Sequence, residues 1–127
     1  MFKVLVLLIL CLDASAEVEV EVSGLEAGVG QISISVFDNA ENFMKSPSKL
    51  QIIKVEGATI KMIFKDINFQ GKAISVIYDK NSNGKLDTNF FGIPSEPYGF
   101  SNNPSTTFGP PKFKAAKMLS EKVKIKL

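Results

Sequence analysis

The residues best suited to chemistry lie in one short run, YDKNSNGKLDTNFFG, at positions 78–92. Side chains that carry oxygen recur there at alternate positions and are followed by a glycine and a further acid: Asp79, Asn81, Asn83, Gly84 and Asp87. In calcium-binding loops, oxygens at positions 1, 3 and 5 converge on the ion, and a glycine at position 6 permits the sharp turn. The run matches the first nine positions of such a loop and predicts a calcium site.

The later positions of a calcium-binding loop are matched less fully here. Position 7 binds through a backbone carbonyl, which Lys85 would supply, and position 9, Asp87, often acts through water. Position 12 normally carries a bidentate acid but holds Phe90, and the next acid along the chain is Glu96. Asparagines and nearby lysines lower the ligand charge, so we expect a weak site with a dissociation constant of about 10⁻⁴–10⁻³ M.

The same residues also suit a turn that needs no metal. The dipeptide Asn83-Gly84 is a strong signal for a β-hairpin. Asp and Asn side chains also bond to the backbone two residues further on, which ties a loop together. The sequence leaves two interpretations open: a weak calcium loop, or a loop held by its own hydrogen bonds.

The run opens a long segment, residues 79–111, that has no regular hydrophobic period. Loops beyond about 12–15 residues are uncommon in compact domains and are usually functional or disordered. Disordered segments are poor in aromatic residues, whereas this one is rich in them: Phe90, Phe91, Tyr98, Phe100 and Phe108. We therefore expect one long ordered loop that packs on a small core of its own.

The elements that must position this loop are β-strands. Apolar residues alternate with polar ones, or form short β-branched runs, in six stretches: 17–22, 31–37, 50–56, 59–67, 72–79 and 121–127. Helix signals are confined to 38–50, with Asp38 or Asn39 as the N-cap, and to 112–119, which also suits a final irregular strand. The pattern predicts an all-β fold, an antiparallel β-sandwich of immunoglobulin-like or prealbumin-like topology.

The first and last strands carry opposite charge. EVEVEV at 17–22 presents glutamates on one face, and EKVKIKL at 121–127 presents lysines. Side by side, the two strands would form cross-strand charge pairs. Alternatively both are solvated faces, and the lysines protect an exposed sheet edge. Self-association through these two edges would indicate a structural protein.

The N-terminal residues 1–16, MFKVLVLLILCLDASA, have the pattern of a secretory signal peptide. Lys3 precedes an apolar run that is too short to span a bilayer, and Ala14-Ser15-Ala16 provides small residues before a cleavage point. We expect one domain at 17–127, exported to the periplasm or outside the cell. No second apolar stretch is long enough for a transmembrane segment.

Composition excludes several classes of function. The chain has no His and no Arg, and its one cysteine, Cys11, lies within the predicted signal peptide. Ser–His–Asp and Cys–His catalytic sites therefore lack their residues, and zinc lacks its usual ligands. With 15 basic and 13 acidic residues the net charge is +2, which gives no basic footprint for nucleic acid. We expect no enzyme activity.

The segments DKNSNGKLDTNFFGIPSEPYGFSNN and FGPPKFKAAKM, at 79–103 and 108–118, closely resemble the bacterial secreted family catalogued as domain of unknown function 2141. The residues that carry the resemblance are Asp79, Asn81, Asn83, Gly84, Leu86, Asp87, Gly92, Pro94, Glu96, Tyr98, Gly99, Phe100, Ser101, Asn102, Gly109, Pro110, Phe113 and Ala116. The resemblance implies a signal peptide and a small exported β domain, and it implies no established activity.

Three functions remain open. The first is a non-catalytic binding or accessory module whose partner is a protein or a glycan of the cell envelope. The metal ligands of such a module would be Asp79, Asn81, Asn83, Lys85, Asp87 and Glu96, with calcium as the one cofactor we expect. The second is a structural or self-assembling envelope component with a hydrogen-bonded loop and no metal. The third and most remote is a glycoside hydrolase that uses a pair of carboxylates.

Overall fold

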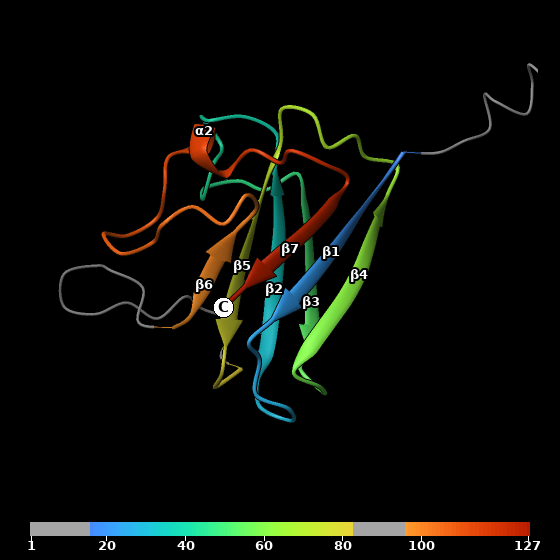
Figure 1. Cartoon of the computed structure of the whole chain (residues 1–127), viewed down its shortest axis with the longest axis vertical. Helices are drawn as coiled ribbons and strands as arrows, with labels where there is room; N and C mark the ends of the chain where they lie inside the picture. The colour runs from blue at the N-terminus through green and yellow to red at the C-terminus, as the bar shows by residue number, and fades with distance from the viewer. Residues whose placement is uncertain (1–15, 83–95) are drawn as a thin grey trace, which may run out of the picture.

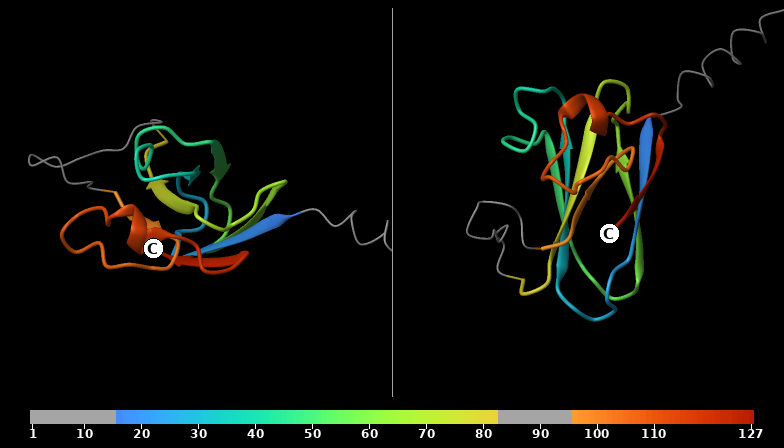
Figure 2. Two further views of the ribbon diagram at one scale, coloured as in Figure 1. Left: turned by 90° about the horizontal axis from the view of Figure 1, so that it is seen from above. Right: turned by 60° about the vertical axis from the view of Figure 1, so that its left-hand side comes forward.

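The computed structural model describes residues 16–82 and 96–127. The chain forms two facing β-sheets, one of three strands in the order β4-β1-β7 and one of four in the order β3-β2-β5-β6 (Figures 1 and 2). The elements are β1 (Glu17–Ser23), β2 (Gln31–Phe37), β3 (Lys49–Lys54), β4 (Thr59–Lys65), β5 (Ala73–Asp79), β6 (Tyr98–Phe100), α2 (Phe113–Ala116) and β7 (Lys122–Lys126). The predicted β-sandwich is confirmed.

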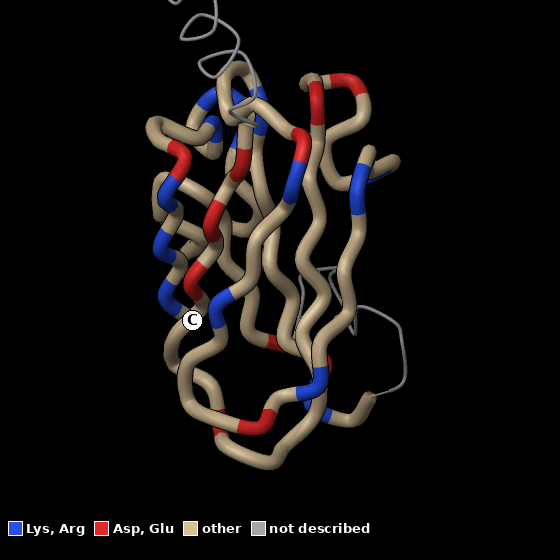
Figure 3. Tube along the Cα trace, turned by 90° about the vertical axis from the view of Figure 1, so that its right-hand side faces the viewer, with Lys and Arg blue, Asp and Glu red and all other residues tan. Residues whose placement is uncertain are grey.

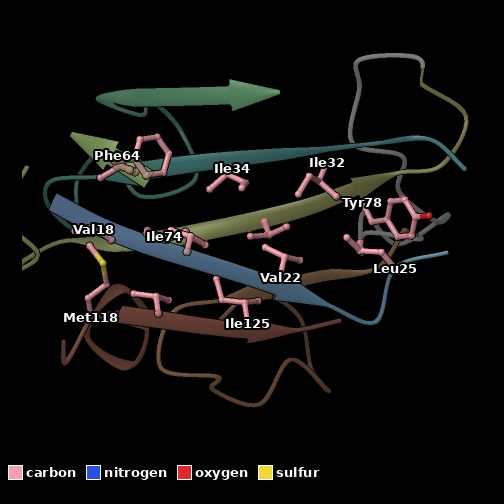
Figure 4. Close-up of a cluster of buried hydrophobic side chains, with 14 of the residues drawn as sticks. Val18, Val22, Leu25, Ile32, Ile34, Phe64, Ile74, Tyr78, Met118 and Ile125 are labelled. Carbon is pink, nitrogen blue, oxygen red and sulfur yellow. The ribbon is translucent and has the colours of Figure 1, made fainter. Parts of the chain in front are cut away.

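The period of two seen in the sequence sets which side chains enter the core. In β1 every second residue is fully buried, and the glutamates between them face outwards. The same alternation in β2 sends its isoleucines inwards. Figure 4 shows how these side chains meet between the sheets. The buried cluster consists of Val18, Val20, Val22, Leu25, Ile32, Ile34, Val36, Val55, Phe64, Ile67, Ile74, Val76, Tyr78, Met118, Val123 and Ile125.

The strand order decides between the two expected topologies. In the immunoglobulin fold the first two strands lie in the same sheet, whereas here β1 and β2 lie in opposite sheets. The order therefore differs from the immunoglobulin arrangement and leaves the prealbumin-like alternative. Most strand pairs are antiparallel, as expected, but β1 and β7 pair in parallel.

The two oppositely charged strands do lie side by side. Glu19 pairs with Lys122 and Glu21 with Lys124, and Figure 3 shows the acidic residues of β1 beside lysines. On its other side Glu21 faces Lys61 of β4, with 3.7 Å between Oε1 and Nζ. The expectation that β1 offers an open edge for self-association is wrong, because β1 is the central strand of its sheet.

The two helix signals have different outcomes. Residues 38–45 form turns, so the helix expected in 38–50 is absent from that described stretch. Asn39 does accept a bond from the Asn42 N–H at 2.9 Å, as a helix cap would. Met44, however, has a φ of 62°, which ends the helical geometry after one turn. In 112–119 the helix alternative is found as α2, and the strand alternative is not, since α2 is followed by a single isolated bridge between Lys117 and Ala73.

The predicted loop 79–111 contains a strand that the sequence pattern missed. Residues Tyr98–Phe100 form β6, which pairs antiparallel with β5. Three residues are too short to show a period of two, and Gly99 weakens the pattern further. No helix among the described residues is long and apolar enough to cross a membrane. The predicted signal peptide lies outside the described residues, apart from Ala16.

Candidate functional site

Asp79, the first residue of the calcium-like run, lies at the C-terminal end of β5. Its side chain is 2% exposed, and its Oδ2 accepts a hydrogen bond from Gln31 Nε2 at 3.1 Å. Its backbone is packed against Gly30, where an added Cβ would come within 2.5 Å of the Asp79 carbonyl oxygen. Gly30 also has a φ of +71°, which favours glycine. The close packing holds Asp79 rigidly.

Tyr78 fixes the neighbouring loop between β1 and β2. Its hydroxyl donates to the carbonyl of Val29 at 2.7 Å and accepts from the backbone N–H of Glu26 at 3.2 Å. The ring itself is 1% exposed. Because this loop carries Gly30, the buried phenol positions the surface against which Asp79 packs.

Glu96 returns to the start of the same run. Its Oε2 accepts a hydrogen bond from the Lys80 backbone N–H at 2.9 Å. One residue away, the Tyr78 N–H donates to the Pro97 carbonyl at 2.8 Å. The chain therefore leaves the sandwich at Asp79 and returns to it at Glu96, so the two ends of the loop lie close together.

The predicted ligands can now be placed individually. Asp79, Asn81 and Glu96 are described and lie at the base of the loop, and each takes part in further interactions, so none lacks a partner. Asn83, Lys85 and Asp87 lie outside the described residues. Within 16–82 and 96–127, no group of three or more acidic, His or Cys side chains gathers as a metal-binding cluster. The turn at 79–82 is closed by the Ser82 N–H, which donates to the Asp79 carbonyl at 3.2 Å.

The segment that follows β6 is anchored by a buried serine. The hydroxyl of Ser101 accepts from the Ile74 N–H at 2.9 Å and donates to the Ala116 carbonyl in a short contact. The backbone N–H of Ser101 donates to the Ile74 carbonyl at 2.9 Å. Ser101 is completely buried, so its hydroxyl joins β5 to α2 away from water.

Two asparagines extend this anchor to other elements. Asn102 Nδ2 donates to the Ala115 carbonyl at 3.1 Å. Asn103 Nδ2 donates to the Lys124 carbonyl at 2.8 Å, and its Oδ1 accepts from the Lys126 N–H at 3.4 Å. Both asparagines have a positive φ, a conformation in which Asn is enriched. Ser101, Asn102 and Asn103, which we call the SNN anchor, bond to β5, α2 and β7.

A second apolar cluster lies beneath this anchor. Phe43 packs edge-on against Phe37 at 5.4 Å and against Phe113 at 5.6 Å between ring centres. Phe100 joins the cluster at 5.8 Å from Phe43, and Tyr98 packs edge-on against Phe100 at 5.6 Å. Such pairs add about 0.5–1.5 kcal/mol beyond area burial.

The expected core of the loop's own aromatic residues is found only in part: Tyr98 and Phe100 join this cluster, whose other rings come from outside the loop, and Phe108 is 98% exposed. Phe90 and Phe91 lie outside the described residues.

A groove of about 490 Å³ runs between β6 and the end of β7. Its lining includes Tyr98, Thr106 and Lys126. The Tyr98 hydroxyl is 3.5 Å from the Thr106 carbonyl, and burial raises the pKa of the Tyr98 phenol above its ordinary value. The residues around the groove thus include an aromatic residue, a threonine and a lysine.

Several residues that shape this region carry only weak sequence signals. Gln31 has no motif that identifies it as the partner of Asp79, because the contact joins strands far apart in sequence.

Leu50 and Ile52 are exposed on the outer face of β3. A signal for them does exist, since LQIIK places apolar residues on both faces of the strand.

Comparison with known proteins places this geometry in a family. A model described as an uncharacterized protein conserved in bacteria, DUF2141, matches residues 20–126. No curated protein and no solved structure gives a significant match. The match takes in both the base of the loop at Asp79 and the SNN anchor. The chain therefore belongs to the DUF2141 family of uncharacterized bacterial proteins.

Proposed function

We propose that this chain is an exported, non-catalytic binding module that recognises a glycan of the bacterial cell envelope. The recognition surface is the anchored segment 96–111 with the groove between β6 and β7. The observation that carries the proposal is the SNN anchor. Three buried or bonded side chains hold this segment against β5, α2 and β7, and rigid elements that position exposed loop groups are typical of binding sites.

The chemistry of the groove supports a sugar ligand. A volume of about 490 Å³ suits a small ligand or one unit of a polymer. The Tyr98 ring offers an apolar face for the CH surface of a sugar, while Thr106 and Lys126 offer polar groups for its hydroxyls. A partner protein of the envelope is the alternative for this surface.

A binding role fits the acids better than catalysis does. Asp79 is almost fully buried and bonded to Gln31, so its carboxylate is not presented to a polymeric substrate. Glu96 accepts a bond from the backbone at Lys80. These contacts are those of positioning residues, and the chain has no His to act as a general base.

We further propose that calcium stiffens the base of the loop. The ligands would be Asp79, Asn81, Asn83, the Lys85 carbonyl, Asp87 and Glu96. The return of Glu96 to Lys80 supports this set, because it brings the later acid back to the start of the run. With so few acids the site is weak, with a dissociation constant of about 10⁻⁴–10⁻³ M, as is typical of extracellular modules.

Thermal unfolding in calcium, in chelator and in magnesium tests the metal. Calcium at 100 times the dissociation constant stabilises a binding protein by about 2.7 kcal/mol. Glu96→Gln retains an acceptor for the Lys80 N–H but loses the charge, so it should reduce the calcium-induced rise in Tm. Glu41→Gln, an exposed acid elsewhere, should retain the rise. An unchanged Tm in 10 mM calcium would contradict the proposed calcium site. That concentration is about ten times the weakest dissociation constant that we expect.

An NMR titration with soluble fragments of envelope glycan tests the ligand. We expect shifts at Tyr98, Thr106 and Lys126. Thr106→Tyr should fill the groove and abolish them, whereas Thr107→Tyr, on an exposed neighbour, should not. Shifts that are confined to other surfaces, or that survive in Thr106→Tyr, would contradict the proposed site.

A further inference from the structure

Among the strands of residues 16–82 and 96–127, four lie at sheet edges, and β3 differs from the other three. β7 buries its apolar residues and exposes lysines, and β6 is only three residues long. β4 exposes one large apolar side chain, Ile63, at 50%. β3 exposes two, Leu50 at 53% and Ile52 at 51%, both on the outer face of the four-stranded sheet. Among the described strands, β3 is therefore the most apolar open edge.

The backbone of β3 presents hydrogen-bonding groups at the same positions. The Val55 N–H donates to the Gly30 carbonyl at 3.1 Å, at the end of the β2–β3 ladder. Bonded pairs alternate with non-bonded pairs in an antiparallel ladder. Ile53 and Gln51 lie two and four residues before Val55, so their backbone groups also bond towards β2. The N–H and C=O groups of Leu50 and Ile52, which lie between them, therefore point to the open edge.

Nothing in the strand itself prevents another strand from pairing there. Its register with β2 is continuous, and it contains neither a proline nor a bulge. Natural proteins usually protect an open edge with such features or with charge. Here the protection is limited to Lys49 and Lys54, one at each end of the strand.

These two lysines indicate the charge of the partner. β3 carries no acid, so pairing with a second copy would bring the lysines of both copies into one short interface. Lysines gathered at one interface repel one another, whereas acids of a partner would be attracted to them. The lysines therefore disfavour pairing of β3 with a second copy of β3. They favour pairing with a segment that carries acids at both of its ends.

We propose that the open edge of β3 is a docking site for an extended, acid-flanked segment of another protein. The segment adds a fifth strand to the β3-β2-β5-β6 sheet. Its backbone bonds to Leu50 and Ile52, and its alternate apolar side chains pack beside theirs on the outer face. Acids at its ends lie near Lys49 and Lys54. Main-chain bonds supply affinity in this mode of binding, and side chains supply specificity.

Two dye-labelled peptides test the proposal. Both alternate valine with threonine, and one has two aspartates at each end where the other has two lysines. Fluorescence anisotropy with the folded protein should give at least about tenfold tighter binding of the aspartate-flanked peptide. Replacing Lys49 and Lys54 together by Glu should reverse the preference.

Matched variants locate the binding edge. Ile52→Thr should weaken binding of the aspartate-flanked peptide, whereas Ile63→Thr, at an equally exposed isoleucine on the other sheet, should not. Equal loss in both variants, equal affinity for the two peptides, or no binding at about 1 mM peptide would overturn the proposal. Sedimentation that shows a dimer abolished by Ile52→Thr would also overturn it, because the occupant would then be a second copy. None of these results depends on calcium or on the groove.

Discussion

The four-stranded sheet has two edges that are built in opposite ways. At one edge the short strand β6 leads directly into the SNN anchor, and Gly99 packs against Ile125 of β7 and against Leu127, which follows β7. At the other edge β3 is six residues long, and two large apolar side chains are about half exposed. The anchored edge uses its polar groups inside the fold. The open edge keeps its backbone groups available, so loss of the buried contacts at β6 should reduce stability, whereas substitutions on β3 should reduce strand docking with little effect on stability.

The largest expected effect is at the anchored edge. Ser101→Ala leaves the Ile74 N–H and the Ala116 carbonyl without a partner in a fully buried position. Each lost bond of this kind costs about 1–3 kcal/mol, so we expect a loss of about 2–4 kcal/mol in the free energy of unfolding. Urea denaturation measures it. Ser105→Ala, at an exposed serine, should cost less than about 0.5 kcal/mol, and equal losses would remove the special role of Ser101.

A somewhat smaller loss is expected where β6 meets β7. A Cβ at position 99 would lie 2.8 Å from Ile125 Cγ2 and 2.9 Å from Leu127 Cδ2. Gly99→Ala therefore overpacks the contact, and we expect a cost of about 1–3 kcal/mol. The matched control is Gly57→Ala, where the nearest atom to the added carbon, the Thr59 carbonyl oxygen, is 3.8 Å away. If both variants have the same Tm, β6 does not pack closely on β7.

The smallest effect on stability is expected at the open edge. Ile52 is half exposed, so Ile52→Thr should change the free energy of unfolding by less than about 0.5 kcal/mol. Its neighbour Ile53 packs against the core, so Ile53→Thr should cost about 1–2 kcal/mol. Denaturant midpoints for the pair compare the two faces of one strand. A large loss in Ile52→Thr would mean that its side chain is covered.

Regular alternation in two strands, one from each sheet, explains why sequence patterns predicted the fold well. Strands 17–22 and 31–37 alternate so regularly that burial follows directly from residue type. Charge made the adjacency of β1 and β7 one of two open alternatives, and the register shows that the two strands do lie side by side. That β1 is central was not predictable, because an alternating strand has the same pattern at the centre of a sheet as at its edge.

The site was harder to predict because its contacts join distant residues. The spacing of Asp79, Asn81 and Glu96 predicted calcium ligands, which stays a prediction, and the structure places these three residues at the base of the loop. The bond from Gln31 to Asp79 and the link from Ser101 to Ala116 depend on how strands are ordered. Periodicity gives no information on that order. The same limit applies at 38–45, where a correct cap at Asn39 is followed by a positive φ at Met44.

The contrast between the two edges can be measured most directly by amide hydrogen exchange. Free protein at low concentration should show fast exchange at Leu50 and Ile52, whose N–H groups point to the open edge, and slow exchange at Gln51 and Ile53. The Ser101 amide, bonded to the Ile74 carbonyl at 2.9 Å, should be protected as well. If Leu50 and Ile52 are protected as strongly as Gln51 and Ile53, and remain so on dilution, the edge of β3 is closed within the chain. That result would contradict an open docking edge at β3.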